Sequence, residues 1–335
     1  MSSFSIGVDL GGTNLRVGAF TSKFERIGLS TTPTRVFAGP EAVARDMCDE
    51  IVKLMRSCAD SRTLQGIGVG SPGPLELPAG RLGAPPNLPG FEGFELKQTL
   101  ENMLQLPVHV EHDSNAAALA ECHSGSGKEH HETSMCMLTL GTGVGAGLVL
   151  DGRVWHGMNG MAGEAGHIPV EPRGPRCSCG GRGCLELYAS ASGIHRMATE
   201  LASAGNSPAI FSVLDHDAST ILALAGLADR GDAQACEVFC QAGRSLGAAL
   251  AGLVNVLNLP LYVIGGGVAN AWHLFAPAMM EELTELSYVY RLTRPNPSTG
   301  SSNGTAAGRG TTRVVPALLG SDAGLMGAAM LPYAN

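Results

Sequence analysis

The sequence predicts an α/β fold built from two related halves. Two strand–loop–strand units with glycine-rich loops lie about 130 residues apart, and helical and strand patterns alternate after each of them. The chain has 335 residues, which is longer than one ordinary compact domain and suits two. We therefore expect two α/β domains with a cleft between them. The first covers residues 1–115 and is joined by a C-terminal helix at 320–335, and the second covers residues 116–319.

The first half opens with a predicted β-hairpin. Two β-rich runs, residues 5–10 and 15–20, enclose a polar, glycine-rich turn. Residues 40–59 carry apolar side chains at helical spacing, which predicts a helix. The remaining elements expected in this half are a strand at 66–70, a helix at 94–106, a strand at 108–110 and a helix at 115–121.

The second half repeats this order. Predicted strands at 135–140 and 148–150 flank a glycine-rich loop, and Asp151-Gly152 then predicts a tight hairpin turn. A mainly helical region leads to a strand at 261–264. Residues 294–310 are rich in Pro, Gly and Ser and are expected to form a mobile loop. A last helix at 323–331 is rich in small residues, so we expect it to pack closely on another element.

Composition and charge exclude several classes of protein. The net charge of −8 argues against a nucleic-acid binder, which needs a basic face. The N-terminus has no basic segment followed by an apolar one, so we expect no secretory signal and a cytoplasmic protein. The apolar stretch at 246–268 contains two Asn and one Pro, which predicts helix, turn and strand rather than a membrane span.

The first glycine-rich turn has the composition of an anion-binding site. Glycines there allow consecutive N–H groups to point into one concavity, and Thr13 adds a hydroxyl donor. Asp9 is placed to orient Mg²⁺ through water. The residues expected to bind the phosphates are Asp9, Gly11, Gly12, Thr13, Asn14 and Arg16.

A second glycine-rich loop repeats this chemistry, and a third glycine cluster follows a strand near residue 264. Neither loop matches a Walker A or a Rossmann pattern. Either glycine-rich loop alone would more often be an ordinary hairpin turn. The presence of two such loops and a third glycine cluster in one chain favours a nucleotide-binding site. The residues concerned are Gly141, Thr142 and Gly143 for phosphate, and Gly265, Gly266 and Gly267 for adenine and ribose.

The cysteines predict a metal site rather than disulfides. Their number is nine, which is odd, and three of them fall within residues 177–184. Cys177, Cys179 and Cys184 with His167 make a suitable tetrahedral set for zinc. Four protein ligands leave no open position, so this zinc would be structural. The alternative is three buried free cysteines and a core histidine.

A carboxylate at a strand–helix junction is the candidate catalytic base. Asp113 follows the strand at 108–110 and precedes the helix at 115–121, where a helix N-terminus keeps a carboxylate ionised. Phosphoryl transfer to a hydroxyl needs such a proton acceptor. The alternative is a helix N-cap aspartate, which is a common role for this residue type.

The segment from Gly163-Glu164 through His167 and the cysteines to Glu186 resembles the ROK family (repressors, open reading frames, kinases). The likeness covers nearly the whole chain and is nearest to the glucokinase branch. It implies the actin-like (RNase H-like) ATPase fold, ATP, Mg²⁺ and structural Zn²⁺ as cofactors, and a homodimer. By this resemblance Asp113 is the base, and the sugar is bound by Asp113 together with Asn87, His112, Glu164, His167 and Glu186. The alternatives are that Glu186 supports the zinc ligands and that Asn87 only shapes a turn.

The function implied is an ATP-dependent hexokinase that phosphorylates the 6-hydroxyl of glucose. His112 departs from the family, which usually has Asn before the catalytic Asp, and this puts the sugar in doubt. Kinases for N-acetylglucosamine, N-acetylmannosamine, mannose, fructose or allose are therefore the alternatives, and polyphosphate stays open as donor. A sugar-sensing repressor or a binding-only scaffold is disfavoured, since eight residues precede Asp9 and both phosphate loops and the base are present.

Overall fold

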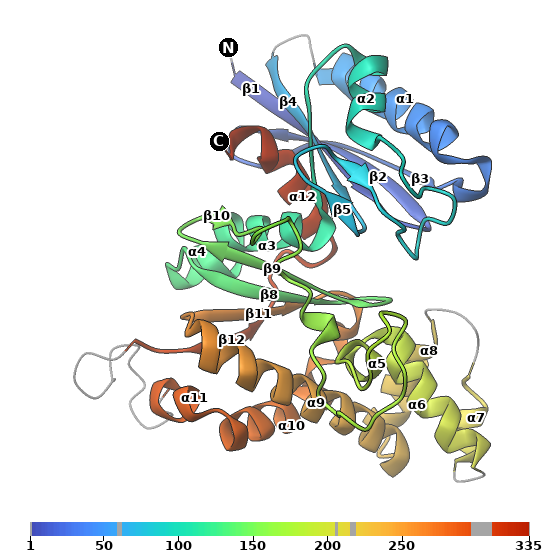
Figure 1. Ribbon diagram of the computed structural model, residues 1–335, viewed down its shortest axis with the longest axis vertical. Coiled ribbons are helices and arrows are strands. Elements are labelled where there is room, and N and C mark those ends of the chain that lie inside the picture. Colours follow the sequence, from blue (N-terminus) through green and yellow to red (C-terminus); the bar gives the residue numbers. More distant parts are fainter. Residues whose placement is uncertain (1, 59–61, 205–206, 215–218, 296–309, 335) are drawn as a thin grey trace. The chain divides into compact units, whose positions relative to one another are not determined.

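The chain forms two compact units in the computed structural model, which describes residues 2–58, 62–204, 207–214, 219–295 and 310–334 (Figure 1). The first unit comprises Met1–Met137, Gly147–Gly163 and Leu318–Asn335, and the second comprises Leu138–Ala146 and Glu164–Ala317. The first unit extends beyond residue 115 because the helix that follows packs on the C-terminal helix. The expected domain limits stay a prediction.

The first five-stranded sheet has the order β3-β2-β1-β4-β7. Neighbours among β1, β2 and β3 are antiparallel, whereas β4 lies parallel to both β1 and β7. Its strands are β1 Ser2–Leu10, β2 Asn14–Thr21, β3 Arg26–Pro33, β4 Arg62–Ser71 and β7 Val108–His112. A separate two-stranded sheet is formed by β5 Leu75–Glu76 and β6 Arg81–Leu82.

The second five-stranded sheet repeats this topology. Its order is β10-β9-β8-β11-β12, so in both sheets the strands, counted along the chain, run third, second, first, fourth and fifth. Its strands are β8 Met135–Leu140, β9 Val144–Leu150, β10 Arg153–Val154, β11 Leu261–Gly265 and β12 Arg313–Pro316. The predicted repetition of one theme is confirmed.

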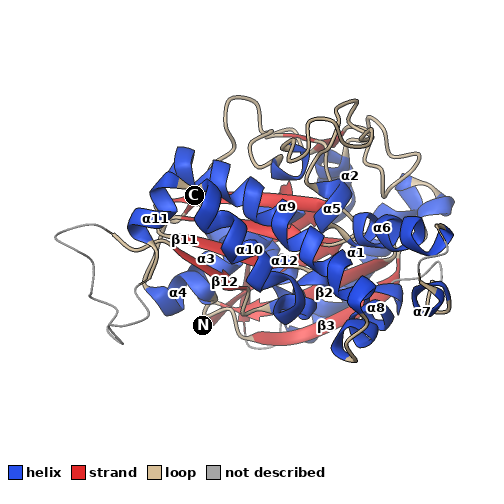
Figure 2. Ribbon diagram, turned by 90° about the horizontal axis from the view of Figure 1, so that it is seen from below, coloured by secondary structure: helices blue, strands red, loops and turns tan. Residues whose placement is uncertain are grey.

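In the second unit α9 and α10 run side by side (Figure 2). The helices of the first unit are α1 Pro40–Cys58, α2 Leu96–Leu104, α3 Asp113–Ser124, α4 Ser126–His130 and α12 Ala323–Met330. Those of the second are α5 Glu186–Ala189, α6 Ala191–Ser203, α7 Pro208–Phe211, α8 Ser219–Asp229, α9 Ala233–Leu257, α10 Trp272–Leu286 and α11 Tyr288–Thr293. Short 3₁₀ turns are η1 Val36–Ala38, η2 Ala165–His167, η3 Gly267–Ala271, η5 Gly320–Asp322 and η6 Leu331–Tyr333.

The strands and helices that were predicted are found within a few residues of their expected bounds, but several elements were not predicted, among them the strands β3, β5, β6 and β12 and the helix α4. β3 and β12 lie at sheet edges, and neither carries a run of buried apolar side chains that a sequence pattern could reveal. Of the loop predicted at 294–310, residues 296–309 lie outside the described residues. Among the described helices, none has the length and apolarity needed to cross a membrane.

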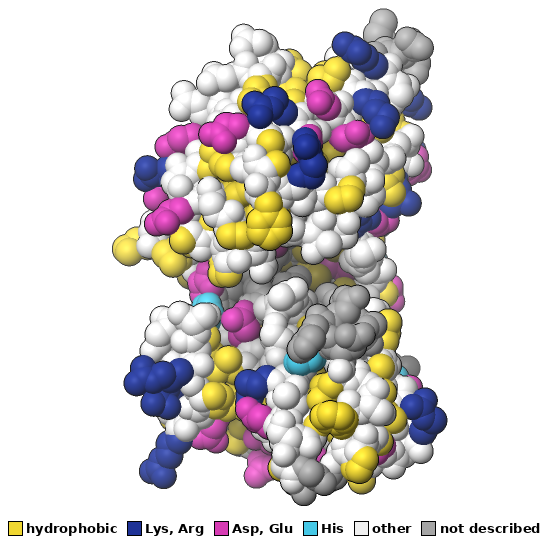
Figure 3. All heavy atoms as spheres, turned by 90° about the vertical axis from the view of Figure 1, so that its right-hand side faces the viewer, with side chains coloured by type: hydrophobic (Ala, Val, Ile, Leu, Met, Phe, Trp, Pro, Cys, Tyr) yellow, Lys and Arg dark blue, Asp and Glu magenta, His cyan; other side chains and the backbone are white. Residues whose placement is uncertain are grey.

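Figure 3 shows Lys and Arg side chains dispersed among acidic and apolar ones over the face in view. Such mixing is ordinary for a protein surface. The expected absence of nucleic-acid binding stays a prediction.

Opposite faces of the first sheet carry different packing. Ile6 and Val8 of β1 lie in one apolar core with Met47 and Ile51 of α1. Gly7 has the opposite orientation, because side chains alternate along a strand, and it lies against α12. The sheet is therefore covered by α1 on one face and by α12 on the other.

Glycine allows α12 to approach the sheet and α3 at backbone distance. A Cβ on Gly68 would lie 1.9 Å from the carbonyl oxygen of Ala328, and one on Gly7 would lie 2.2 Å from that of Leu325. On the other side of the helix, a Cβ on Gly327 would lie 1.7 Å from the oxygen of Ala116. The prediction that the last helix packs closely is confirmed.

We predict that Gly68→Ala destabilises the protein by about 1–3 kcal/mol, the usual cost of overfilling a packed core. The atom in the way is a helix carbonyl, so α12 itself has to move. Urea denaturation measures the change. Gly252→Ala on α9 is the control, because its Cβ would meet open space and helical Ala is favoured over Gly. Equal unfolding midpoints for Gly68→Ala and the wild type would contradict the packing argument.

Candidate active site

The β1–β2 turn has the geometry expected of an anion-binding loop. The Gly11 N–H donates to the oxygen of Asn14 at 3.0 Å and closes the turn. Thr34 holds it from outside: its hydroxyl donates to the Gly11 oxygen at 2.7 Å, and its N–H donates to the Thr13 oxygen at 2.8 Å. Among the described residues, no carbonyl accepts from the N–H groups of Gly12 or Thr13. These two donors are therefore available to a ligand.

Two carboxylates stand near this turn, Asp9 at the end of β1 and Asp113 at the start of α3. Burial, followed by the negative charge of Asp113, raises the pKa of Asp9 to about 6, although Arg16 opposes the shift. Asp113 is 42% exposed, and its Oδ1 accepts the Ser114 N–H at 2.6 Å. Two carboxylates close enough to interact favour a bound cation.

Asp113 does not cap its helix. The N-cap position of α3 is held by His112, and Asp113 is the first helical residue. Its carboxylate is therefore free of the capping role that was the alternative, and it is exposed enough to meet a substrate.

His112 and Asn87 both border these groups. The His112 Nδ1 lies 2.9 Å from the Ser114 hydroxyl and 3.0 Å from Asp113 Oδ1. Asn87 is exposed, and its backbone lies against the phosphate turn, since a Cβ on Gly12 would be 2.6 Å from the Asn87 oxygen. The structure thus brings together the sugar-binding and phosphate-binding residues predicted in the first unit.

Arg16 is engaged by the turn that precedes α12. Its guanidinium donates to the Ser321 oxygen at 2.5 Å and to Asp322 at 2.6 Å, and Arg26 also pairs with Asp322. These bonds tie β2 to the C-terminal helix. A contact between Arg16 and nucleotide stays a prediction.

Sequence reasoning missed an ion pair between a histidine and a buried acid in the strand that leads to Asp113. Glu111 of β7 is 7% exposed, and its carboxylate accepts from His156 Nε2 at 2.6 Å, from the His112 N–H at 2.8 Å and from Asn115 Nδ2 at 2.9 Å. Burial alone would raise the pKa of Glu111, but these donors, His156 first, bring it below its usual value. The hydrogen bond to Glu111 raises the pKa of His156. A charged residue inside a strand was the available signal, because it needs a partner there.

We predict that this pair makes stability depend on pH. Because the pKa of His156 is raised in the folded protein, this residue stabilises the fold at pH values below its ordinary pKa of 6.5. That stabilisation is lost as the pH rises through the pKa of the folded state. Because the pKa of Glu111 is lowered in the folded protein, this residue stabilises the fold at pH values above its ordinary pKa of 4.5. That stabilisation is lost as the pH falls through the pKa of the folded state. The pair thus contributes most between pH 4.5 and 6.5.

His156→Ala should cost about 1–2 kcal/mol at pH 6, below the usual cost of breaking a buried pair because His156 is 40% exposed. The difference from wild type in chemical denaturation should shrink above pH 8. His156→Gln, which keeps a neutral donor, is the control and should show a flatter pH profile. A His156→Ala deficit that stays constant from pH 5 to 9 would contradict the assignment.

In the second unit, the loop between β8 and β9 is held by its neighbours. The Gly141 oxygen accepts from the Ala191 N–H at 2.8 Å, the Thr142 oxygen accepts from the Ser192 hydroxyl, and the Val144 N–H donates to Glu186 Oε2 at 3.0 Å. These contacts come from residues 186–192, which include the start of α5 and of α6.

The third glycine cluster lies against the end of β8. Gly266 has φ +88°, which favours glycine, and a Cβ there would be 2.4 Å from the Leu140 oxygen. The turn at 265–267 and the loop at 141–143 therefore start from adjacent strand ends, β11 and β8. This is the arrangement expected if both contact one nucleotide.

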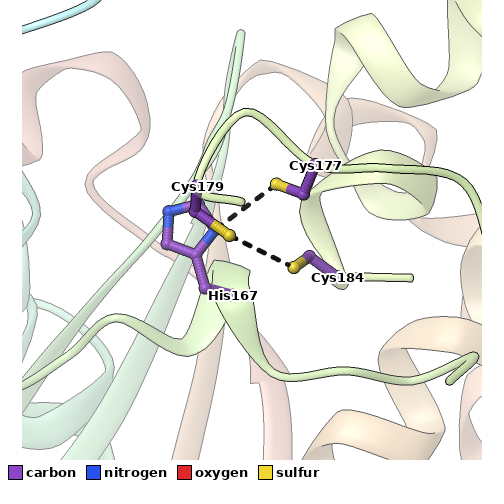
Figure 4. A group of neighbouring side chains, drawn as sticks. All are labelled: His167, Cys177, Cys179 and Cys184. Carbon is purple, nitrogen blue, oxygen red and sulfur yellow. Dashed lines mark hydrogen bonds between the residues drawn. The ribbon is translucent and has the colours of Figure 1, made fainter. Parts of the chain in front are cut away.

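The four predicted metal ligands converge (Figure 4). One donor atom from each of His167, Cys177, Cys179 and Cys184 lies within 4.8 Å of the others. The Sγ atoms of Cys179 and Cys184 are 3.7 Å apart, as is Cys177 Sγ from His167 Nδ1. Thiolates about 2.3 Å from a tetrahedral zinc are about 3.8 Å apart. The donor set and its spacing fit zinc.

His167 presents its two ring nitrogens to different partners. Nδ1 faces Cys177, while Nε2 lies 3.9 Å from Glu164 Oε2. A metal on Nδ1 would fix the ring and leave Nε2 beside Glu164. The predicted site residues thus form two groups, one in each unit.

The chain matches known proteins over nearly its whole length. The model of the ROK family matches residues 5–334. A glucokinase of Halalkalibacterium halodurans is 40% identical over 79% of this chain and 81% of its own, and that of Thermotoga maritima is 32% identical over 97% and 96%. A ROK family glucokinase from Streptomyces griseus, solved with glucose and AMPPNP, superposes with a TM-score of 0.76 at 28% identity, over 98% of this chain and 99% of that one. The expected actin-like ATPase fold is confirmed, and the chain belongs to the ROK family.

Proposed function

We propose that this protein is an ATP-dependent hexokinase that transfers the γ-phosphoryl group of ATP to the 6-hydroxyl of glucose. The observation that carries the proposal is the exposed carboxylate of Asp113 at the start of α3, beside Asp9 and the phosphate turn. Glucokinase relatives at 30–40% identity support the same reaction.

In the proposed reaction Asp113 accepts the proton of the 6-hydroxyl as its oxygen attacks the γ-phosphorus. The new bond joins that oxygen to phosphorus, the bond from phosphorus to the β–γ bridging oxygen breaks, and ADP leaves with that electron pair. The side chain of Asp113 is 42% exposed, so the sugar hydroxyl can reach its carboxylate. Excluding water at this step would protect ATP from hydrolysis.

Nucleotide binding is assigned to the three glycine clusters. The N–H groups of Gly12 and Thr13 and the loop at 141–143 would take the phosphates, and the turn at 265–267 would lie against adenosine. Asp9 would orient Mg²⁺. The charge of the cation would offset the repulsion between Asp113 and Asp9, which contributes to the raised pKa of Asp9.

Hexose binding is assigned to polar side chains that suit a polyol. Glu164, His167 and Glu186 in the second unit, and Asn87 and His112 in the first, would pair the ring hydroxyls, each of which needs a partner once water is excluded. Glucose is the expected sugar. Because His112 replaces an amide with an imidazole, another hexose is the alternative.

The Cys177, Cys179, Cys184 and His167 cluster would hold a structural zinc ion. The ion would supply four strong bonds to the loop, and it would fix His167 for the sugar. We also propose a cytoplasmic homodimer that binds neither nucleic acid nor membrane.

The proposed function is tested by ADP release with ATP and Mg²⁺ across a panel of hexoses, with polyphosphate as a second donor. We expect turnover to be greatest with glucose and ATP. Asp113→Asn should lower kcat by at least about 100-fold, since it keeps the shape of the side chain but removes the base. Its glucose affinity by calorimetry should change little. Full activity of Asp113→Asn would remove it from this role, and no turnover with any hexose would refute the kinase assignment.

Loss of the metal should unfold the cysteine loop. Cys179→Ser is expected to lower the zinc content measured by atomic absorption to well below one ion per chain and to lower the melting temperature together with it, because metal binding contributes directly to folding. Cys58→Ser, a buried cysteine on α1 outside the cluster, is the control and should keep its zinc. An unchanged metal content in Cys179→Ser would refute the zinc site.

A further inference from the structure

Glu186 makes a contact that sugar binding does not explain. Its Oε2 accepts the backbone N–H of Val144 at 3.0 Å. Val144 is the first residue of β9 and directly follows the loop at 141–143. A carboxylate assigned to the hexose therefore also touches the end of the loop assigned to phosphate.

The missing side chain of Gly143 makes this contact possible. A Cβ there would lie 2.4 Å from Glu186 Oε2, so any larger residue would displace the carboxylate. Gly166, near the metal ligand His167, is equally close to the loop, since its Cβ would lie 2.1 Å from the Val144 oxygen. Both ends of the metal-binding segment thus meet the residues at the end of the β8–β9 loop, one through the Glu186 side chain and the other through the Gly166 backbone.

The rest of the loop is held by the residues that follow Glu186. The Ala191 N–H donates to the Gly141 oxygen at 2.8 Å, and the Ser192 hydroxyl donates to the Thr142 oxygen. These bonds use carbonyl groups of the loop. Glu186 alone among them acts as an acceptor, and it fixes the N–H that begins β9.

We propose that Glu186 is a positioning residue for the phosphate loop as well as a sugar ligand, so that one carboxylate couples the binding of hexose and of nucleotide. This rests on the proposed function. Oε2 holds the Val144 N–H, and Oε1 takes a sugar hydroxyl. A hydroxyl on Oε1 restricts the side chain to the conformation in which Oε2 meets Val144.

The consequence is cooperative binding of the two substrates. Binding of the first substrate orders the Glu186 side chain and the loop, at a cost in conformational entropy. The second substrate then binds to a site that is already ordered and loses less entropy. Linkage requires the effect to be reciprocal: glucose tightens the nucleotide by the same factor by which the nucleotide tightens glucose.

Calorimetric titration of Mg²⁺–AMPPNP, with and without glucose, tests the proposal. Without glucose, Glu186→Ala should weaken AMPPNP about tenfold, the loss expected for a hydrogen bond to a charged acceptor. Glucose should tighten AMPPNP in the wild type and should not do so in Glu186→Ala. Adenosine, which has no phosphates, should bind both proteins equally.

Two further variants distinguish the role of Glu186 in positioning the loop from its contact with the sugar and from a general loss of folding. Glu186→Gln keeps an oxygen for the Val144 N–H, so its AMPPNP affinity without glucose should stay within threefold of wild type while glucose binds more weakly. Glu164→Ala removes another carboxylate of the second unit, which lies 3.9 Å from His167 Nε2, and it should weaken glucose binding alone.

An AMPPNP affinity without glucose that is equal in Glu186→Ala and wild type would overturn the proposal, as would an equal loss of adenosine affinity. Neither result would touch the hexokinase assignment, which depends on turnover by the wild-type protein.

Discussion

Close contact between α12, the first sheet and α3 is the constraint on which the first unit depends. Three glycines, Gly7, Gly68 and Gly327, leave no Cβ atoms between these elements, so helix and strand backbones meet directly. The sheet carries Asp9 and α3 begins with Asp113, and α12 packs on both. Backbone packing thereby fixes the positions of the strand and the helix that carry the two carboxylates, and precise positioning of this kind favours catalysis.

The second unit uses the same principle for a different purpose. Glycines at 143, 166 and 266 allow the β8–β9 loop to be approached by a carboxylate, by the segment that carries the cysteine cluster and by the turn after β11. The loop is thus shaped by its neighbours, through hydrogen bonds to its carbonyls and to Val144. A metal ion in the cysteine cluster would stabilise the segment that makes these contacts, so its influence would extend to substrate binding.

A buried carboxylate, Glu111, lies two residues before Asp113 and is fully hydrogen-bonded. Glu111 is in β7, and Asp113 is the first residue of α3. The Glu111 carboxylate accepts hydrogen bonds from His156, from Asn115 and from the His112 N–H. Because its negative charge is paired there, Glu111 orders the strand–helix junction while Asp113 keeps an exposed carboxylate. An unpaired acid at position 111 would instead destabilise the junction, since a buried charge requires a partner.

The sequence by itself determined the repeated α/β order, the glycine clusters, the zinc-type ligand set and the family. These depend on local spacing and residue chemistry, which are visible along the chain. It missed the edge strands β3 and β12, because edge strands need no continuous apolar pattern. Only the tertiary structure decided that Glu111 pairs with His156, that Arg16 is tied to Asp322, and that Glu186 reaches Val144. These partners lie 45, 306 and 42 residues apart, and no local rule specifies such pairings because packing of distant elements creates them.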